Sequence, residues 1–462
     1  MQTQIIKLNS FRPGSQTICR ILFFTIFLPW TFLILHGETQ SQDLSQPWDL
    51  NRCISWATDN HLQVQKARLQ NGEQSEYLKQ AKASRYPDLS VQFSQSLTND
   101  QMKDQLTGDY TDQQYNAGNF SLGASVTLFN GNKINNTITQ QELSLQASQL
   151  AVEVAQNSIE ISVTQAYLNL LYANESVKQA EQTLEGSGVQ LEWAQSHYDA
   201  GSMAEADFAR IQSQYATDAY SLTVAQNEMA RHILRLKQLL ELELGQEMQV
   251  DFPEIADSLV FQEIPREADV YRKALETMPE IEGSQVSVKA AQVDLKLANA
   301  GYWPELSANV GAGTGYNTLS TDGFGVQMDR GLNEYAGLSL NIPIYSGRTN
   351  KTARAVARIN IAQSNLSLEE SRKTLLESVE NVWLDALSGQ KRFQVAGEQL
   401  KASEISYRLT EEQFNLGLKN SVDLITAKND FLVAQQEFIQ AKYSAILNFK
   451  LLDFYQGKSI VL

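Results

Sequence analysis

Positive charge is scarce in this sequence, and so is proline. The chain of 462 residues has 37 Lys and Arg against 53 Asp and Glu, which gives a formal net charge of −16. Nucleic-acid binding depends on clustered Lys and Arg that neutralise phosphates, so this balance argues against a nucleic-acid partner. The nine prolines leave room for long helices, because proline breaks a helix interior.

Cysteine is equally rare, since only Cys19 and Cys53 occur. Cys19 precedes an apolar segment that we expect to be removed, so Cys53 would stand alone in the mature chain and could form no internal disulfide. Leu50, Ile54 and Trp56 flank Cys53 at helical spacing. This spacing predicts a packed helix residue rather than a reactive thiol.

The N-terminal region is basic and then apolar. An uncharged apolar run over residues 21–35 follows Lys7, Arg12 and Arg20. The run is shorter than the roughly 20 residues of a membrane-spanning helix. The pattern predicts a signal peptide within residues 1–42, although it does not fix the cleavage site. A retained N-terminal anchor is the alternative.

Motifs of catalysis and metal binding are also absent. The sequence has no Walker motif, nucleophile elbow or His-Glu-x-x-His motif. No two histidines stand at metal-ligand spacing. We therefore expect a protein that is not an enzyme and that uses no cofactor and no metal. A rival enzyme hypothesis would rest on Asp207 or Asp423, and neither has a matched catalytic group.

The sequence does contain an internal duplication. The repeated patterns are the steps Tyr86-Pro87 and Trp303-Pro304, the segments Phe129-Asn130-Gly131 and Tyr345-Ser346-Gly347, the turns Tyr198-x-x-Gly201 and Phe414-x-x-Gly417, and the acids Asp207 and Asp423. The offset is 417 − 201 = 216 for the turns, too long for a solenoid repeat. We predict a first structural repeat over 43–245, a linker over 246–265 and a second repeat over 266–462.

Each repeat contains two segments in which apolar and polar residues alternate. Strict alternation predicts strands with one apolar and one polar face. These strands are expected at 87–98, 118–130, 304–315 and 334–346. The polar faces are Ser, Thr, Gly, Asn and Gln with almost no charge, which suits a membrane strand between lipid and a water-filled lumen. A soluble sheet with one wet face is the alternative.

Helices are predicted around the strands. Each repeat opens with a helix, at about 48–85 or 266–302, and continues after its strands into a very long helix, a turn near Gly201 or Gly417, and a returning helix. Apolar and small residues at alternating steps of four and three predict coiled-coil seams in these long helices. Glycine suits the tight turns. Ser202-Met203-Ala204-Glu205 has the form of a capping box for the first returning helix.

Two repeats supply only four strands, which is too few to close a barrel. An open sheet in lipid would leave unpaired backbone groups along two edges, and the bilayer does not tolerate this. If the strands lie in a membrane, several chains must share one barrel. The predicted fold class is therefore mainly α with a membrane β-part, in an obligate oligomer. A secreted coiled-coil structural or adhesive protein is the rival, and it leaves the alternating strands unexplained.

This layout resembles the TolC family of bacterial outer-membrane efflux proteins over about residues 48–457. The doubled aromatic-proline steps, strand ends and glycine turns carry the resemblance. It implies a homotrimer in the outer-membrane lipid, with one shared twelve-stranded β-barrel and a periplasmic α-barrel of long antiparallel helices. The stretches 98–119 and 317–334 would be extracellular loops. The implied function is passive exit of small molecules, ions or proteins.

The resemblance also implies partners and roles for the turn residues. A periplasmic adaptor, driven by an inner-membrane pump of the RND, ABC or MFS type, would dock where the helices turn. The residues expected at these docking turns are Gly201, Ser202, Gly417 and Leu418.

The family's gate lies at the second turn. Threefold symmetry would place the Asp423 carboxylates around the pore axis, where they would attract cations. Thr426 stands where family members can carry a second acid. The simpler interpretation of Asp423 is an acid that the helix dipole favours in a first turn.

A lock for the closed state is implied by the same resemblance. Lys419 stands where a family member carries a locking arginine, and Asp207 on the first turn is its expected partner. Phe414 replaces the tyrosine of that lock and has no hydroxyl. We therefore expect the lock to be rewired in this chain.

Overall fold

The structure is a computed structural model that describes residues 47–103, 108–243, 245–246 and 248–462. The predicted signal peptide over 1–42 lies outside the described residues. Among the described residues, no helix is both long enough and apolar enough for a membrane span.

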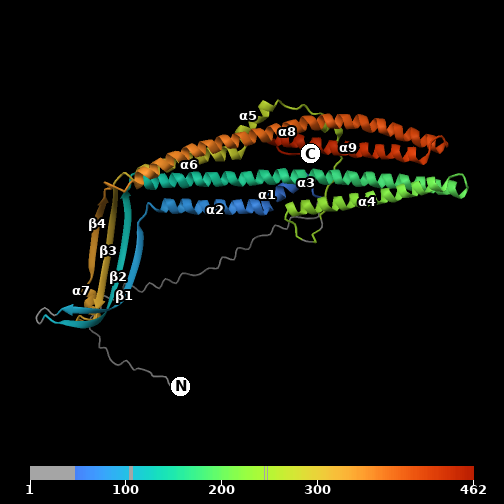
Figure 1. Ribbon diagram of the computed structural model, residues 1–462. Coiled ribbons are helices and arrows are strands. Elements are labelled where there is room, and N and C mark those ends of the chain that lie inside the picture. The colour runs from blue at the N-terminus through green and yellow to red at the C-terminus, as the bar shows by residue number, and fades with distance from the viewer. Residues whose placement is uncertain (1–46, 104–107, 244, 247) are drawn as a thin grey trace, which may run out of the picture. The chain divides into compact units, whose positions relative to one another are not determined.

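The elements follow nearly the same order twice, with a short 3-10 helix between the two runs and one additional helix, between the strands, in the second run (Figure 1). The first run is α1 (Leu50–Asn60), α2 (Leu62–Ala83), β1 (Asp88–Lys103), β2 (Tyr110–Phe129), α3 (Lys133–Asp199) and α4 (Glu205–Leu239). The second run, after η1 (Asp257–Phe261), is α5 (Glu267–Thr277), α6 (Pro279–Ala300), β3 (Glu305–Asn317), α7 (Phe324–Arg330), β4 (Asn333–Asn341), α8 (Thr349–Asn415) and α9 (Ser421–Tyr455). The predicted class, mainly helical with four strands, is confirmed.

The helix that opens each repeat is divided in two. Pro279 is the first residue of α6, and Met278 before it is extended, because proline disfavours a helical residue ahead of it. His61 separates α1 from α2, and its Nδ1 accepts a hydrogen bond of 3.1 Å from the Gln63 backbone N–H. The unbroken helices expected at 48–85 and 266–302 are therefore wrong at these two residues.

The four strands form one antiparallel sheet in the order β1-β2-β3-β4, and Figure 1 shows them side by side. β1 and β2 pair as far as Lys103 and Tyr110, whereas β3 joins β2 only from Ala117 onward. The stretch 98–119 is therefore largely a β-hairpin rather than a loop. Backbone pairing across the hairpin maintains the strands there, although the side chains no longer alternate.

The second hairpin also differs from its predicted form. β4 ends at Asn341, five residues before the expected end, because Pro343 has no backbone N–H to donate to a neighbouring strand. The expected loop over 317–334 contains the seven-residue helix α7.

The long helices pack as two antiparallel pairs, α3 with α4 and α8 with α9 (Figure 1). α3 and α8 have 67 residues each, and such helices are about 100 Å long at about 1.5 Å per residue. Small residues permit close approach within the second pair. A Cβ placed on Gly389 of α8 would lie 3.2 Å from the Cα of Ala445 on α9.

The largest buried cluster joins both repeats, and the predicted linker contributes to it. Trp48, Tyr167, Leu236, Val260 and Phe449 are among its members. The Tyr167 hydroxyl donates to the backbone oxygen of Asp251 at 2.7 Å. The segment between the repeats is therefore fixed to the helices.

Cys53 lies inside this cluster and is fully buried. Burial, with a smaller contribution from Asp49, raises the thiol pKa to about 12. Only about one thiol in ten thousand would then be ionised at pH 8, and the thiolate is the nucleophile. We expect no reaction of the folded mature chain, which lacks Cys19, with a disulfide reagent such as dithionitrobenzoate over minutes, and one equivalent in denaturant. One equivalent of rapid reaction before denaturation would contradict the buried position.

Candidate functional site

One face of the sheet is apolar and exposed. The strand register aligns Phe93 with Phe120, whose ring centroids lie 4.7 Å apart, and aligns Leu122 with both Val91 and Ala312. The large exposed members of this face are Leu89, Val91, Phe93, Leu97, Leu122, Val310, Leu338 and Leu340. A contiguous apolar surface of this kind is a site of association with lipid or protein.

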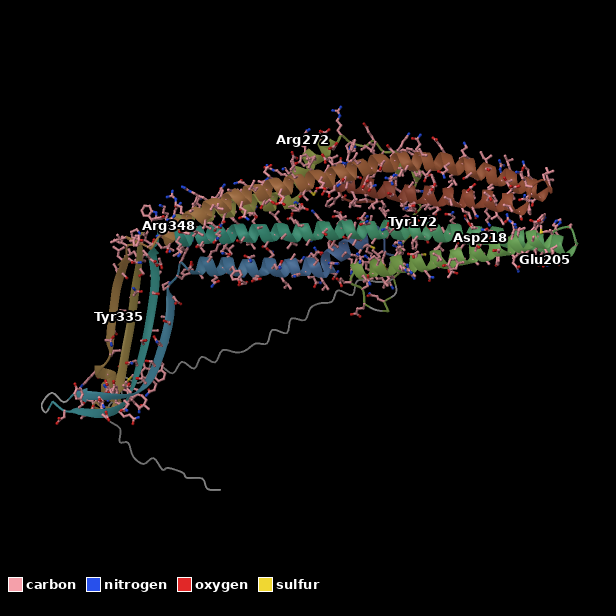
Figure 2. The ribbon with its side chains drawn as sticks, viewed as in Figure 1. Tyr172, Glu205, Asp218, Arg272, Tyr335 and Arg348 are labelled. Atoms are coloured by element: carbon pink, nitrogen blue, oxygen red, sulfur yellow. The ribbon has the colours of Figure 1, made fainter. Side chains whose placement is uncertain are left out.

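The opposite face of the sheet is polar and carries no charge along its central rows. Gln92 aligns with Ser121, and Ser121 aligns with Gly313. Tyr335 of β4, labelled in Figure 2, lies across Gly311, because a Cβ at Gly311 would come within 2.7 Å of its ring. This face therefore suits water, and the glycine leaves room for the tyrosine ring beside it.

The outer strands β1 and β4 each have one neighbour in the described chain. Each strand therefore presents a row of backbone N–H and C=O groups that this sheet does not pair. Next to an apolar face, these groups need partners from another strand.

The two helix turns have the same backbone geometry. Gly201 and Gly417 adopt φ values of +73° and +74°, which glycine tolerates best. At the first turn, the Ser202 N–H donates to the His197 oxygen at 2.9 Å. At the second, the Leu418 N–H donates to the Gln413 oxygen at the same distance. Both are Schellman turns, in which the glycine follows the helix end.

The capping box expected at Ser202 does not form. The N-cap of α4 is Ala204, which makes no side-chain cap bond. The Ser202 hydroxyl instead donates to the His197 backbone oxygen at 2.9 Å, closing the end of α3. The second turn does have a side-chain cap, because Asn420 Oδ1 accepts from the Asp423 N–H at 2.9 Å.

The two turns are joined by a buried contact. The Ser421 hydroxyl of α9 donates to Asp207 Oδ1 of α4 at 2.5 Å, and Ser421 is fully buried. Phe414 packs against Trp193 with their ring centroids 5.4 Å apart. Ala194, Ile211, Phe414 and Leu424 form the buried apolar cluster around this contact.

The expected pair of Lys419 with Asp207 is wrong in this structure. Lys419 Nζ lies 3.7 Å from Asp423 Oδ2, which is four residues further along the chain, in the first turn of α9. Both side chains are more than 40% exposed, so the pair contributes little to stability. Thr426 is exposed one turn further along α9. Asp207 already accepts a hydrogen bond from the Ser421 hydroxyl.

A polar bridge that the sequence analysis missed links α3 to α8. The Gln190 side-chain amide donates to the Tyr407 hydroxyl at 2.9 Å and to Glu411 Oε1 at 2.8 Å. The Tyr407 hydroxyl donates to the same carboxylate at 3.0 Å. Burial and the nearby Glu411 raise the pKa of Tyr407. Tyr407 lies two helical turns before Phe414 on α8.

A buried ion pair was also missed. Lys428 Nζ of α9 lies 2.8 Å from Asp218 Oδ2 of α4, and the two side chains are 6% and 4% exposed. Ser187 donates to Oδ2 at 2.6 Å, and Gln214 donates to Oδ1 at 2.9 Å. Figure 2 shows Asp218 among the long helices, away from Glu205 at the turn.

A signal for this pair was present in the sequence. Asp218 occupies a seam position of α4, between Tyr215 and Leu222 at steps of three and four. A charge at such a position requires a partner when the seam packs. Its counterpart in the second repeat, at 218 + 216 = 434, is Ala434.

No metal centre is formed by the part of the chain that the structure describes, because no three His, Cys, Asp or Glu side chains gather there. The candidate site consists of two parts. One is a sheet that has an apolar face and open edges, and the other is two helix pairs that are bridged at their turns.

A family model described as outer membrane efflux protein matches this chain twice, over residues 53–241 and 270–457. The two matches cover one stretch in each run of elements. Together they span well over half of the chain.

Known proteins of similar sequence and structure agree with this match. The outer membrane protein TolC of Escherichia coli (strain K12) is 20% identical over 419 residues, which are 88% of this chain and 81% of that protein. The crystal structure of CusC matches with a TM-score of 0.76 at 19% identity, over 89% of this chain and 92% of the other. The outer membrane protein VceC of Vibrio cholerae matches with a TM-score of 0.72 at 15% identity, over 89% and 97% of the two chains.

Proposed function

Because this chain belongs to the family of outer membrane efflux proteins, we propose that three copies of it form one exit duct. The protein is an outer-membrane efflux channel rather than a secreted coiled-coil structural or adhesive protein. Its cargo passes passively, and no bond is made or broken.

The open edges of the sheet carry this proposal. Four strands with an apolar exposed face fit lipid on one side, and the polar face fits a water-filled lumen. Pairing β1 of one chain with β4 of the next leaves no edge in the bilayer. Three chains with four strands each close a twelve-stranded barrel, wide enough for a channel.

The helix pairs extend the duct into the periplasm, and the bridges at their turns hold it closed. Opening requires α8 and α9 to move away from α3 and α4. That movement breaks the Asp207–Ser421 hydrogen bond and the bridge from Gln190 to Tyr407 and Glu411.

A periplasmic adaptor, coupled to an inner-membrane pump of the RND, ABC or MFS type, supplies the force. It docks at the turns formed by Gly201, Ser202, Gly417 and Leu418. The exposed side chains of Leu416 and Leu418, at 74% and 72%, offer it an apolar contact.

The second turn selects for cations. Three Asp423 carboxylates, one from each chain, form a ring around the axis, and Lys419 beside each one moderates its charge. In planar bilayers the purified protein should conduct with a preference for cations and be blocked by divalent ions. Asp423→Ala should reduce both effects several-fold, and Thr426→Asp should strengthen both by adding a second ring.

Asp199→Ala is the matched control, because it removes an exposed acid beside the Gly201 turn rather than beside the Gly417 turn. It should leave selectivity and divalent block unchanged. Equal selectivity in wild type and Asp423→Ala would refute the ring, whereas absence of any conductance would refute the channel.

A further inference from the structure

The connection between β3 and β4 carries many exposed apolar side chains. Phe324 and Val326 of α7 are 56% and 43% exposed, and Leu319 and Leu332 on either side of α7 are 42% and 57% exposed. In the β1–β2 hairpin, by contrast, Asn99, Asp100, Gln114 and Asn116 are exposed and polar. The two hairpins of one sheet therefore suit different surroundings.

α7 packs against the apolar face of the sheet. Thr314 aligns with Phe120, so its side chain lies on that face, and its hydroxyl donates to the Met328 backbone oxygen of α7 at 2.6 Å. Tyr316 lies on the same face two residues further along. Its ring meets the Phe324 ring edge to face at 5.0 Å. α7 therefore continues the surface that the proposed function places in lipid.

Several polar groups of this connection are satisfied from within. The Gly331 N–H donates to the Gln327 oxygen at 2.7 Å, and the Gln327 side chain donates to the Asp322 oxygen at 2.6 Å. Gln327 Oε1 also accepts from the Asn317 N–H at 2.9 Å. Arg330 pairs with Asp322 at 2.8 Å. Internal satisfaction of this kind is what a lipid-facing segment needs, since lipid supplies no hydrogen bonds.

We propose that α7 is an interfacial anchor. It lies on the lipid side of the barrel at the outer end of the strands and inserts Phe324 and Val326 where acyl chains meet headgroups. Aromatic rings favour that depth, and the neighbouring exposed aliphatic side chains add apolar area there. The inference rests on the proposed function, because it requires the apolar face of the sheet to lie in lipid. It refines the extracellular loop expected at 317–334, because part of that stretch would lie in the lipid interface.

Spin labels test the position of α7 in the assembled protein in lipid vesicles. Separate variants Val326→Cys, Leu338→Cys and Gln114→Cys place one nitroxide on α7, on the apolar face of β4 and on the polar hairpin. Native Cys53 is buried and needs no replacement. Line broadening by oxygen shows that a label lies in lipid, and broadening by a water-soluble nickel chelate shows that it lies in water.

For the Val326→Cys and Leu338→Cys labels, line broadening by oxygen should exceed broadening by the nickel chelate several-fold. For the Gln114→Cys label, broadening by the nickel chelate should be the larger of the two. Lipid-like behaviour of the Leu338→Cys label with water-like behaviour of the Val326→Cys label would overturn the anchor alone. Low access of both reagents to the Val326→Cys label would mean that a neighbouring chain covers α7, which also overturns it. Water-like behaviour of the Leu338→Cys label would overturn the proposed function itself.

Discussion

Replacement of Lys428 by methionine should destabilise the folded chain by about 3–5 kcal/mol, the usual cost when a buried charge loses its partner. Methionine fills a similar volume, so the loss is electrostatic rather than a cavity. Asp218 would keep its bonds from Ser187 and Gln214 but no countercharge. The measurement is the urea midpoint of the helical circular dichroism signal in detergent, compared with wild type.

Two further variants make this test specific. Lys401→Met removes an exposed lysine from α8 and should change stability by less than about 0.5 kcal/mol. The double variant Asp218→Leu with Lys428→Met removes both charges, so it should recover most of the loss. If the double variant is as unstable as the sum of its single variants, the two side chains do not act as a pair.

Replacement of Leu338 by arginine should abolish most assembly in the outer membrane. Leu338 lies on the apolar face of β4 and is 71% exposed. Arginine on the lipid face of a barrel costs about 2–4 kcal/mol at the bilayer midplane. Three chains would each carry this cost in one assembly. The measurement is the yield of heat-modifiable oligomer in the outer-membrane fraction.

The adjacent residue provides the control for this prediction. Ser339 is on the same strand but faces the polar side of the sheet. Ser339→Arg should therefore assemble normally and lower the cation preference of the channel, since its charge lies in the lumen. Normal assembly of Leu338→Arg together with failure of Ser339→Arg would mean that the lipid and lumen faces have been exchanged.

The strands and the order of the elements were predictable because they depend on local patterns. Alternation marks a strand with two unlike faces, and the apolar face defined by Val91, Leu122 and Leu338 follows from it. The helix break before Pro279 has a sequence signal, since proline restricts the backbone conformation of the residue before it. His61 has no comparable signature, although its side chain caps α2 by accepting from the Gln63 N–H.

The pairings between distant segments were harder to predict. The contacts of Asp207 with Ser421 and of Asp218 with Lys428 join residues more than 200 positions apart. The seam position of Asp218 indicates that its charge needs a partner, but sequence spacing does not identify Lys428 as that partner. Lys419 and Asp423 are four residues apart, but Lys419 precedes the first residue of α9, so the helix period does not predict their ion pair. The family resemblance predicts Asp207 as the partner of Lys419 instead.

The central claim is that a single chain cannot close the barrel and pairs β1 with β4 of identical neighbours. Within one chain β1 and β4 are separated by two strands, or about 14 Å at about 4.8 Å per step, which exceeds the reach of a disulfide. Val91→Cys should therefore be combined with Ala336→Cys, Leu338→Cys or Leu340→Cys, and the membranes oxidised. Leu122→Cys with Leu338→Cys is the control, because β2 is not an edge.

The decisive measurement is the ladder of cross-linked chains on a denaturing gel. We predict that at least one edge pair yields linked chains up to three and no more, and that the control pair yields single chains. Single chains from all three edge pairs, with the protein folded and monodisperse without detergent, would contradict the account.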